Sequence, residues 1–465
     1  MLLVCNYFCN FAHIFNIIKE KVMKHLRWII PLIVTVILVV NSSCSPNHEL
    51  FDQDVTQAIS DSLSPVDSID KNHTWVLTDK RTITVTANAD VNAQWLKILT
   101  ADPRKDPNAE VTTQVMIADG ETTFMSFCYP KIVTTLYAAL VDDEGRFTVT
   151  AFSPNDTKVD FSEPLYTKQL ISYIPQPQTF VYCYEEEMPD YTKLDFDYND
   201  VVLGISYERT GEREIRFHVT LNAVGTDRPM SAALHLKNFK YDEIESVTTE
   251  GGASFNVNSQ GTEIAEQDVS ANLLRTRELL LKSQNQAKEE DKEAVINLFC
   301  DAHWATGDLL KPNEQYVINH WHYNVSKTSS QDMSYRTIVP REVTFIVTFK
   351  EAKGLEYLDF DLIDPFIIKE YLGGTFEVHQ FAYRNDWVLK EYKIAEIVKL
   401  PWALVIPYKK FRHPLEGVNI GFKKKGALGF GAYGYRGHSL GEWSMNHNLA
   451  NDWYLNEYAT ENQVY

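Results

Sequence analysis

Hydrophobic and polar residues alternate with a period of two through much of the chain, as they do in β-strands with one buried face. Ile83 and Val85 stand between threonines, and residues 132–141 and 146–152 flank an Asp-Asp-Glu-Gly turn that is typical of a hairpin. The same alternation returns at residues 215–221 and 343–349. No long helical pattern accompanies these strands, so the fold class is predicted to be mainly β.

Length and turn spacing divide the predicted strands into two β-sandwich domains in tandem. The N-terminal β-sandwich is placed at residues 71–160 and the second at residues 165–465. A Leu-rich, charged stretch at residues 272–282 predicts a short amphipathic helix followed by a charged loop. We interpret this helix as an insertion in the second sandwich, because the strands around it are sufficient to bury a core.

Residues 1–43 have the outline of a signal peptide. Lys24 and Arg27 precede an apolar run at residues 28–40, and small residues follow it. This run is shorter than the about 20 residues that a helix needs to cross a bilayer. Met23 is the expected start, because the residues before it place apolar side chains and cysteines ahead of the basic stretch.

Cys44 directly follows these small residues, with Asn41 where bacterial lipoproteins usually have leucine. This arrangement resembles the lipobox, whose cysteine is diacylated and becomes the first mature residue. Stable anchoring takes two or more acyl chains, which such a modification supplies. We expect Cys44 to be lipidated and residues 44–70, rich in Ser, Asp and Pro, to form a tether. The alternative is an uncleaved signal anchor with a buried Cys44.

Acidic residues outnumber basic residues, with 63 Asp and Glu against 44 Lys and Arg and a net charge of −19. A chain of this charge repels nucleic acid and suits a surface protein or a cation binder. Besides Cys44, the predicted mature chain contains Cys128, Cys183 and Cys300, which are widely spaced and fit neither a disulfide framework nor a zinc pattern. Buried thiols are the expected interpretation.

The strongest candidate for chemistry is an acidic loop with Asp195, Asp197, Asn199 and Asp200. Oxygen-bearing side chains at every second residue match the opening of a calcium loop, so these four residues are the predicted Ca²⁺ ligands. An EF-hand is excluded, because the sixth position is Asp200 where glycine is required and the twelfth is Ser206 where glutamate is required.

Acidic residues upstream of this loop could complete a metal shell: Glu185, Glu186, Glu187 and Asp190. The alternative to a metal site is an acidic turn that leads into a strand. In that interpretation the Asp and Asn side chains bond backbone amides, while Phe196 and Tyr198 pack inward.

Aromatic residues crowd the last 80 positions, among them Trp402, Trp443, Trp453 and Tyr454. Exposed planar rings could stack against sugars, so these four are candidate binding residues. Aromatic side chains more often fill cores, because each buries about 150 to 250 Å².

The acidic loop also carries a family resemblance. The run Asp195-Phe196-Asp197-Tyr198-Asn199-Asp200-Val201-Val202 resembles the signature of the LruC domain of spirochaete and Bacteroides-type surface lipoproteins. Three later stretches resemble the same family in the same order: Asp364-Pro365-Phe366-Ile367, then Leu400-Pro401-Trp402-Ala403-Leu404-Val405-Ile406-Pro407, then Asn451-Asp452-Trp453-Tyr454. The resemblance covers residues 180–465 and implies a β-sandwich surface lipoprotein of unestablished activity.

Together these features predict an outer-membrane or cell-surface lipoprotein that acts as a binding or adhesion module stabilised by Ca²⁺. Its expected partners are the membrane, through the lipid, and a glycan or a surface protein. Two alternatives come from other classes. A glycan-active hydrolase would hold two carboxylates about 5 to 9.5 Å apart in a cleft. A structural subunit of a surface assembly would present an open sheet edge.

Overall fold

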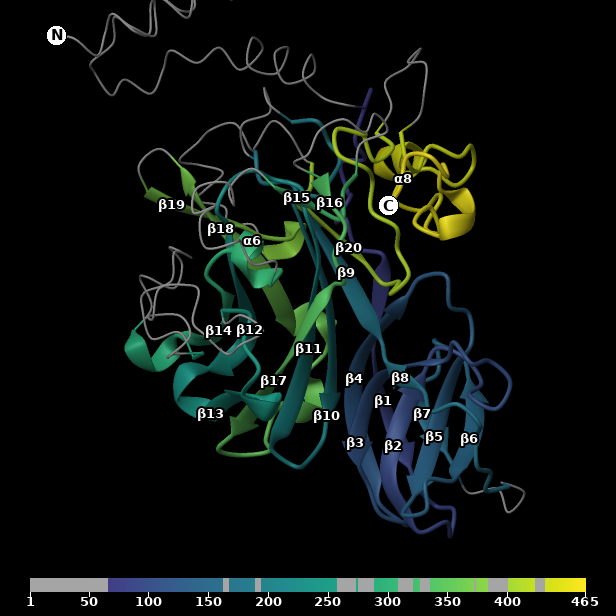
Figure 1. The fold of residues 1–465 in the computed structure, drawn as a ribbon. Coiled ribbons are helices and arrows are strands. Elements are labelled where there is room, and N and C mark those ends of the chain that lie inside the picture. The colour runs from purple at the N-terminus through teal and green to yellow at the C-terminus, as the bar shows by residue number, and fades with distance from the viewer. Residues whose placement is uncertain are drawn as a thin grey trace, which may run out of the picture. The chain divides into compact units, whose positions relative to one another are not determined.

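The computed structural model is mainly β, which confirms the fold class predicted from the sequence (Figure 1). The structure describes residues 66–161, 167–188, 194–256, 273–274, 288–307, 321–326, 335–371, 374–383, 400–422 and 431–465. These residues belong to one compact unit, Ser60–Tyr465. The predicted signal peptide, Cys44 and most of the predicted tether lie outside the described residues.

The first β-sandwich consists of a three-stranded and a five-stranded sheet. The three-stranded sheet has the order β4-β1-β7, formed by β1 (Thr78–Thr86), β4 (Thr122–Pro130) and β7 (Lys158–Asp160). The five-stranded sheet has the order β6-β5-β2-β3-β8, formed by β2 (Ala93–Leu99), β3 (Glu110–Met116), β5 (Leu136–Asp142), β6 (Phe147–Phe152) and β8 (Gln176–Pro177). The predicted hairpin is confirmed, because β5 and β6 pair antiparallel across their turn.

The second β-sandwich consists of an eight-stranded and a four-stranded sheet. The path β13-β17-β11-β10-β9-β20 is formed by β9 (Thr179–Tyr184), β10 (Val201–Arg209), β11 (Glu214–Val224), β13 (Ile244–Thr249), β17 (Arg341–Phe349) and β20 (Ala403–Ile406). Off this path, β15 (His322–Tyr323) pairs with β11 and with β16 (Tyr335–Arg336). The order β14-β12-β18-β19 is formed by β12 (Ser231–Lys240), β14 (Glu293–Phe299), β18 (Ile363–Tyr371) and β19 (Gly374–Val378).

In β11 the alternating residues bury one face of the strand, as the pattern predicts. In β11, Ile215, Phe217, Val219 and Leu221 are at most 2% exposed, while the residues between them are half-buried. Burial of one such side chain contributes about 1.5 to 3 kcal/mol to folding. The largest core includes these residues and extends to Trp75, close to the start of β1.

Helices are short in the described part of the chain. The α-helices there are α6 (Ala302–Ala305) and α8 (Leu440–Met445), and each begins after a capping side chain that accepts backbone N–H groups, Asp301 and Ser439 respectively. Single 3₁₀ turns complete the connections: η1 (Tyr241–Glu243), η2 (Glu250–Gly252), η3 (Glu289–Asp291), η5 (Leu355–Tyr357), η6 (Phe360–Leu362), η7 (Phe381–Tyr383) and η8 (Asn456–Tyr458).

None of the helices in the described residues is long and apolar enough to cross a membrane. The helix predicted at residues 272–282 lies outside the described residues, apart from Leu273 and Leu274. Of the cysteines in the described residues, Cys128 and Cys183 are buried thiols, as expected, and Cys300 is half-buried.

The four aromatic residues proposed as a sugar platform lie in the core. Trp402 and Tyr454 are 1% exposed, and Trp443 and Trp453 are fully buried. Because stacking against a sugar needs an exposed ring face, these four side chains offer no such surface in this structure. Their packing, with Trp443 and Trp453 rings 5.9 Å apart, is that of core residues.

The segment that leads into β1 is fastened to the segment around α8. The amide of Asp70 donates to the carbonyl of Ser444 at 3.0 Å, and its carboxylate lies 2.5 Å from Nδ1 of His447. The imidazole of His73 contacts the carbonyl of Trp443 at 2.9 Å. Residues almost 380 positions apart in the sequence are therefore held together just ahead of the first strand.

Candidate metal centre

The acidic loop closes a pair of adjacent antiparallel strands. Tyr184 is the last residue of β9, Val201 is the first residue of β10, and the two are paired in the ladder. Glu185 and Asp200 therefore leave the sheet side by side. The residues between them form the loop, of which residues 189–193 lie outside the described part.

Three carboxylates meet in this loop. One oxygen each of Glu185, Asp195 and Asp197 lies within 4.8 Å of the others. Calcium binds oxygen at about 2.3 to 2.6 Å, so oxygens that share one ion are at most about 5 Å apart. Glu185 and Asp197 are 1% exposed, whereas Asp195 is exposed and provides the solvent side of the group. The spacing is therefore compatible with one shared calcium ion.

Two aromatic residues in the loop have left-handed backbone conformations, Phe196 at φ 62° and Tyr198 at φ 54°. Each such residue costs on the order of 1 to 3 kcal/mol. The core compensates, because Tyr198 donates its hydroxyl to the carbonyl of Pro401 at 2.7 Å and Ile420 donates its amide to the carbonyl of Phe196 at 2.8 Å. These contacts fix the backbone on both sides of Asp197.

The group concentrates negative charge in a buried place. Burial raises the pKa of Glu185 well above its ordinary value, and the charges of Asp200, Asp197 and Asp195 raise it further. Burial also raises the pKa of Asp197, with further contributions from Asp195 and Glu416. In the described residues, none of the three grouped carboxylates forms an ion pair with Lys, Arg or His. Buried carboxylates without a counter-ion favour protonation or a bound cation.

The neighbouring Glu186 differs, because it has cationic partners. Its carboxylate lies 3.2 Å from Nη1 of Arg228 and 3.7 Å from Nζ of Lys369. Burial raises the pKa of Glu186, and both cations oppose that shift. The protein thus supplies positive charge to Glu186, while the adjacent three-carboxylate group receives none from the described residues.

The structure brings two of the four predicted calcium ligands, Asp195 and Asp197, into this group. The other two turn to the backbone. Asp200 accepts a hydrogen bond from the amide of Glu186 at 2.5 Å, and Asn199 donates its side-chain amide to the carbonyl of Pro414 at 3.1 Å. The third member is Glu185, which the sequence indicated only as an upstream residue that could complete the metal shell.

Asn199 leaves an acceptor unused. Its Oδ1 atom is buried and accepts no hydrogen bond from the described residues. The atom lies against Gly225, where an added Cβ would be only 2.1 Å from it. A buried oxygen without a donor is rare in folded proteins and calls for an ion, a water molecule or local strain.

The alternative interpretation of the loop, an Asx-bonded turn, also describes part of the geometry. Asp197 accepts amide hydrogen bonds from Gly417 at 2.8 Å and from Asn199 at 3.3 Å. Tyr198 is fully buried, as that interpretation requires. Each carboxylate has two oxygens and about four acceptor positions, so these bonds leave room for a cation.

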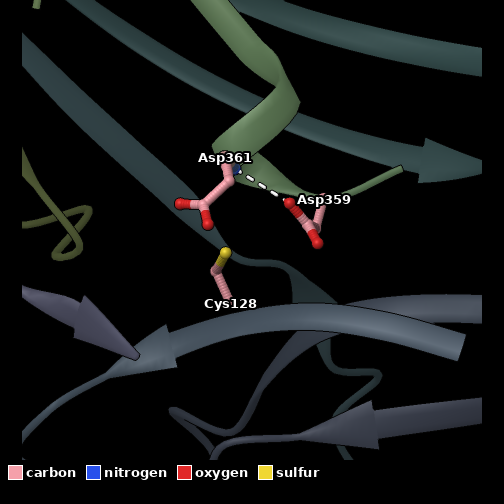
Figure 2. A group of neighbouring side chains, drawn as sticks. All are labelled: Cys128, Asp359 and Asp361. Carbon is pink, nitrogen blue, oxygen red and sulfur yellow. Dashed lines mark hydrogen bonds between the residues drawn. The ribbon is translucent and has the colours of Figure 1, made fainter. Parts of the chain in front are cut away.

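A second group of possible ligands occurs elsewhere. Figure 2 shows the thiol of Cys128, from β4, pointing toward Asp359 and Asp361 at η6, and the ligand atoms lie within 4.8 Å of one another. Here Nζ of Lys80 is 2.9 Å from Asp359 and 3.9 Å from Asp361. Burial raises the pKa of the Cys128 thiol well above its ordinary value. A protonated thiol and a lysine counter-ion make this group self-sufficient without a metal.

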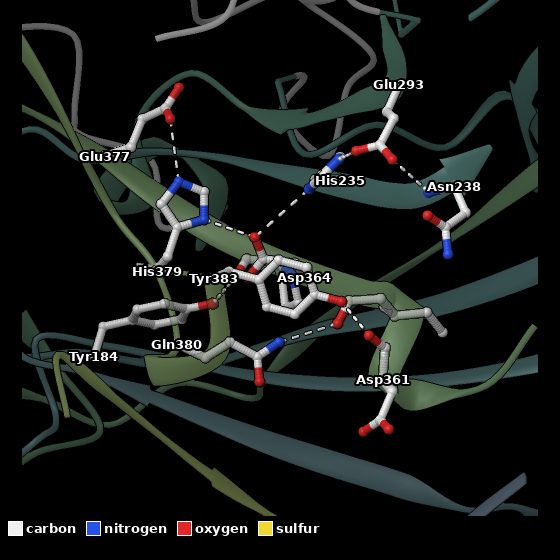
Figure 3. A network of polar contacts seen from close by, with 12 residues as sticks. Tyr184, His235, Asn238, Glu293, Asp361, Asp364, Glu377, His379, Gln380 and Tyr383 are labelled. Carbon is white, nitrogen blue, oxygen red and sulfur yellow. Dashed lines mark hydrogen bonds and ion pairs between the residues drawn. The ribbon is translucent and has the colours of Figure 1, made fainter. Parts of the chain in front are cut away.

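A buried network of histidines and carboxylates lies in the four-stranded sheet (Figure 3). His235 and Asp364 face each other in the ladder of β12 and β18. Asp364 is 2.6 Å from Nδ1 of His379 and 3.8 Å from Nδ1 of His235. The outer nitrogens contact Glu377 at 3.1 Å and Glu293 at 2.8 Å. Carboxylates and imidazoles alternate through the network, so each imidazole lies between two carboxylates.

The network favours the charged forms of its members, a protonated His379 and an ionised Asp364. Burial lowers the pKa of His379, but Asp364 and Glu377 outweigh burial and raise it to about 10. Burial likewise opposes the ionised form of Asp364, while His379 and His235 hold its pKa below the ordinary value. Both residues are therefore charged at neutral pH.

Fold and site together define a tandem β-sandwich protein with a carboxylate-rich candidate metal centre. Residues 213–423 match a family model described as a domain of unknown function, DUF4842. The matched region begins next to β11 and contains the histidine network, while the acidic loop precedes it. A crystal structure of a protein from Bacteroides ovatus, described as a candidate lipoprotein, is similar over 80% of this chain and 99% of that chain, with a TM-score of 0.46 and 16% identity. No curated protein matches the chain.

Proposed function

We propose that this chain is a lipid-anchored binding module of the bacterial cell envelope, in which Ca²⁺ completes the acidic loop of the second β-sandwich. The observation that carries the proposal is the group formed by Glu185, Asp195 and Asp197. Three carboxylate oxygens lie within 4.8 Å of one another, and the described residues supply no cation to them. A hard divalent cation is the partner that such an oxygen set prefers.

The contrast between the two possible metal groups supports this choice. Lys80 occupies the position of a cation beside Asp359, whereas no Lys, Arg or His of the described residues pairs with the three carboxylates of the acidic loop. The unused acceptor of Asn199 lies in the same loop. Calcium bound by Glu185, Asp195 and Asp197 would join the end of β9 to the loop that leads into β10 and would hold both aromatic residues in their strained conformations.

The proposed localisation at the cell envelope is based on the N-terminal sequence. The apolar run at residues 28–40, the small residues after it and Cys44 resemble a lipoprotein signal, which supports a location at the outer membrane or cell surface. The LruC-like run at residues 195–202 supports the same class of surface lipoprotein. A net charge of −19 suits an exposed protein that binds cations.

Burial supports a binding role over hydrolysis at this loop. A glycosidase exposes its two carboxylates to a substrate in a cleft. Here Glu185 and Asp197 are 1% exposed, so a glycan cannot reach both. Their position suits an ion that stabilises the fold.

The test is the thermal midpoint of the purified protein in chelator and in about 10 mM Ca²⁺. A site with Kd of about 0.1 mM adds about 2.7 kcal/mol at that concentration. With an unfolding entropy of about 2.1 cal/mol/K per residue, this free energy raises the midpoint of a unit of roughly 400 residues by about 3 °C. We expect that rise in the wild type and its loss in Asp197→Asn.

Asp361→Asn is the matched control, because it removes a carboxylate from the Cys128 group instead. This variant should keep the full calcium response. A response lost in Asp361→Asn and kept in Asp197→Asn would move the metal to the Cys128 group, and no response in the wild type would remove calcium from the function.

A further inference from the structure

A pocket of about 560 Å³ opens beside the histidine network. Part of its lining comes from residues 74–80, which lead into β1 of the first sandwich, and from Lys131, which directly follows β4. Another part comes from β12, η6 and η7 of the second sandwich. Figure 3 shows four of the lining residues: Asn238, Asp361, Gln380 and Tyr383. Ligand pockets usually measure about 300 to 1,000 Å³ and often lie where two structural layers meet.

Two ammonium groups in the pocket have no carboxylate partner in the described residues. Lys131 donates to the carbonyl of Val76 at 2.6 Å, which leaves two of its three protons. Lys237 is exposed and lies over the ring of Tyr383, with Nζ 5.1 Å from the ring centroid. The third lysine of the lining, Lys80, is paired with aspartates.

The lining also offers groups that suit hydroxyls. Asp79 and Asp361 provide carboxylate oxygens, and the exposed side-chain amide of Asn238 makes no hydrogen bond with the described residues. The half-buried ring of Tyr383 provides apolar surface beside these polar groups. A ligand that carries hydroxyls, one anionic group and an apolar ring face would match all three kinds of surface.

We propose that this pocket binds an acidic sugar, a pyranose that carries a carboxylate, with Lys131 and Lys237 as its anion-binding side chains. The proposal rests on the binding role proposed above and names the class of its ligand. Inorganic phosphate or sulfate fits less well, because Asp79 and Asp361 would repel a multiply charged anion. Sugar hydroxyls would instead donate to both carboxylates.

The experiment is calorimetric titration of the calcium-loaded protein with sodium glucuronate, and with glucose and inorganic phosphate as comparison ligands. We expect a millimolar Kd for glucuronate, weakened by salt. Glucose should bind at least tenfold more weakly, since it lacks the carboxylate. Lys131→Met and Lys237→Met should each weaken glucuronate binding about ten- to a hundredfold, because each removes a charge-assisted hydrogen bond.

Lys353→Met is the matched control, since Lys353 lines a separate surface hollow beside Tyr357. It should bind glucuronate as the wild type does, and all variants should keep their thermal midpoints. Equal binding of glucose and glucuronate, tighter binding of phosphate, or unchanged affinity in both pocket variants would overturn the proposal. The thermal response of the same samples to calcium is a separate measurement. Absence of glucuronate binding would therefore overturn the sugar proposal without affecting the calcium proposal, and absence of the calcium response would leave the sugar proposal standing.

Discussion

Asp364→Asn is the sharpest test of the buried histidine network. The substitution keeps the size of the side chain and an oxygen acceptor but removes the negative charge shared by His379 and His235. In the native protein that charge lies 2.6 Å from Nδ1 of His379, and Asp364 is fully buried. The variant therefore leaves two imidazoles in a buried site with only Glu377 and Glu293 as acidic partners.

The expected cost follows from burial. Removal of one partner from a buried ion pair typically destabilises a protein by about 3 to 5 kcal/mol. An unfolding entropy of about 2.1 cal/mol/K per residue over roughly 400 residues converts this cost into a midpoint about 4 to 6 °C lower. We expect this difference near pH 6, where both histidines of the native protein are charged.

The stabilisation by this network should decrease as the pH rises. The pKa of His379 is about 10 in the folded protein and 6.5 ordinarily, so its contribution is complete below pH 6.5 and is lost as the pH rises toward 10. His235, whose pKa is also raised despite burial, adds in the same direction. The pKa of Asp364 is lowered, so its contribution is lost only as the pH falls below 3.8. Between pH 6.5 and 10, the titration of His379 alone should lower wild-type stability by up to about 1.4 kcal/mol per pH unit.

The assay is urea unfolding of both proteins at several pH values from 6 to 9.5, followed by circular dichroism. The two stability curves should converge as the pH rises. Glu377→Gln serves as the control, since it removes one contact of His379 and keeps Asp364, and its curve should stay close in slope to that of the wild type. Parallel curves for wild type and Asp364→Asn across this range would mean that His379 is neutral in the folded protein, and the reasoning would be refuted.

Three further substitutions test other parts of the structure. Gly225→Ala would place a Cβ 2.1 Å from Oδ1 of Asn199, so we expect a loss of about 1 to 3 kcal/mol by urea unfolding together with a weakened calcium response in the thermal assay. Lys80→Met leaves Asp359 buried without its ion pair, and because Lys80 is 39% exposed we expect the free energy of unfolding to fall by only about 1 to 3 kcal/mol. Lys105→Met is the control, since Lys105 is 81% exposed, and it should change the free energy of unfolding by less than about 0.5 kcal/mol. Trp453→Ala should cost about 3 to 5 kcal/mol and leave glucuronate affinity unchanged in the folded fraction, and a loss of affinity without a loss of stability would assign this ring to a binding surface.

The alternation of residues was enough to predict the mainly β fold, because one-sided burial of a strand is a local property. Ile83 and Val85 in β1, like Val343 and Phe345 in β17, are buried as the pattern requires. The pairing of strands is not local. The ladders that place β17 beside β11, or β12 between β14 and β18, join segments more than 50 residues apart and leave no periodic signal in the sequence.

The acidic loop was found from its sequence, but its ligand set was only partly predictable. Asp195 and Asp197 stand out because acidic residues alternate there. The role of Glu185 depends on the pairing of Tyr184 with Val201, which sets the ends of β9 and β10 side by side. The same pairing turns Asp200 toward the amide of Glu186 and away from the other carboxylates.

The other clusters had no signal in the sequence. Cys128, Asp359 and Lys80 come from three separate segments, and each is unremarkable among its neighbours in the chain. The sequence suggested a sugar platform near the C-terminus because it shows how many aromatic rings are present but not whether they are buried. In the structure, Trp443 and Trp453 are fully buried.

The contacts of Asp70 and His73 with the segment around α8 also determine how the protein would carry mechanical load. With the lipid anchor proposed at Cys44, the protein would be pulled from its N-terminal end whenever the proposed ligand is held by another body. The pull would reach the bonds from Asp70 to Ser444 and His447 and from His73 to Trp443 before it reaches β1. These bonds would share the force between the first strand and the C-terminal segment, so the first sandwich would not have to resist peeling alone.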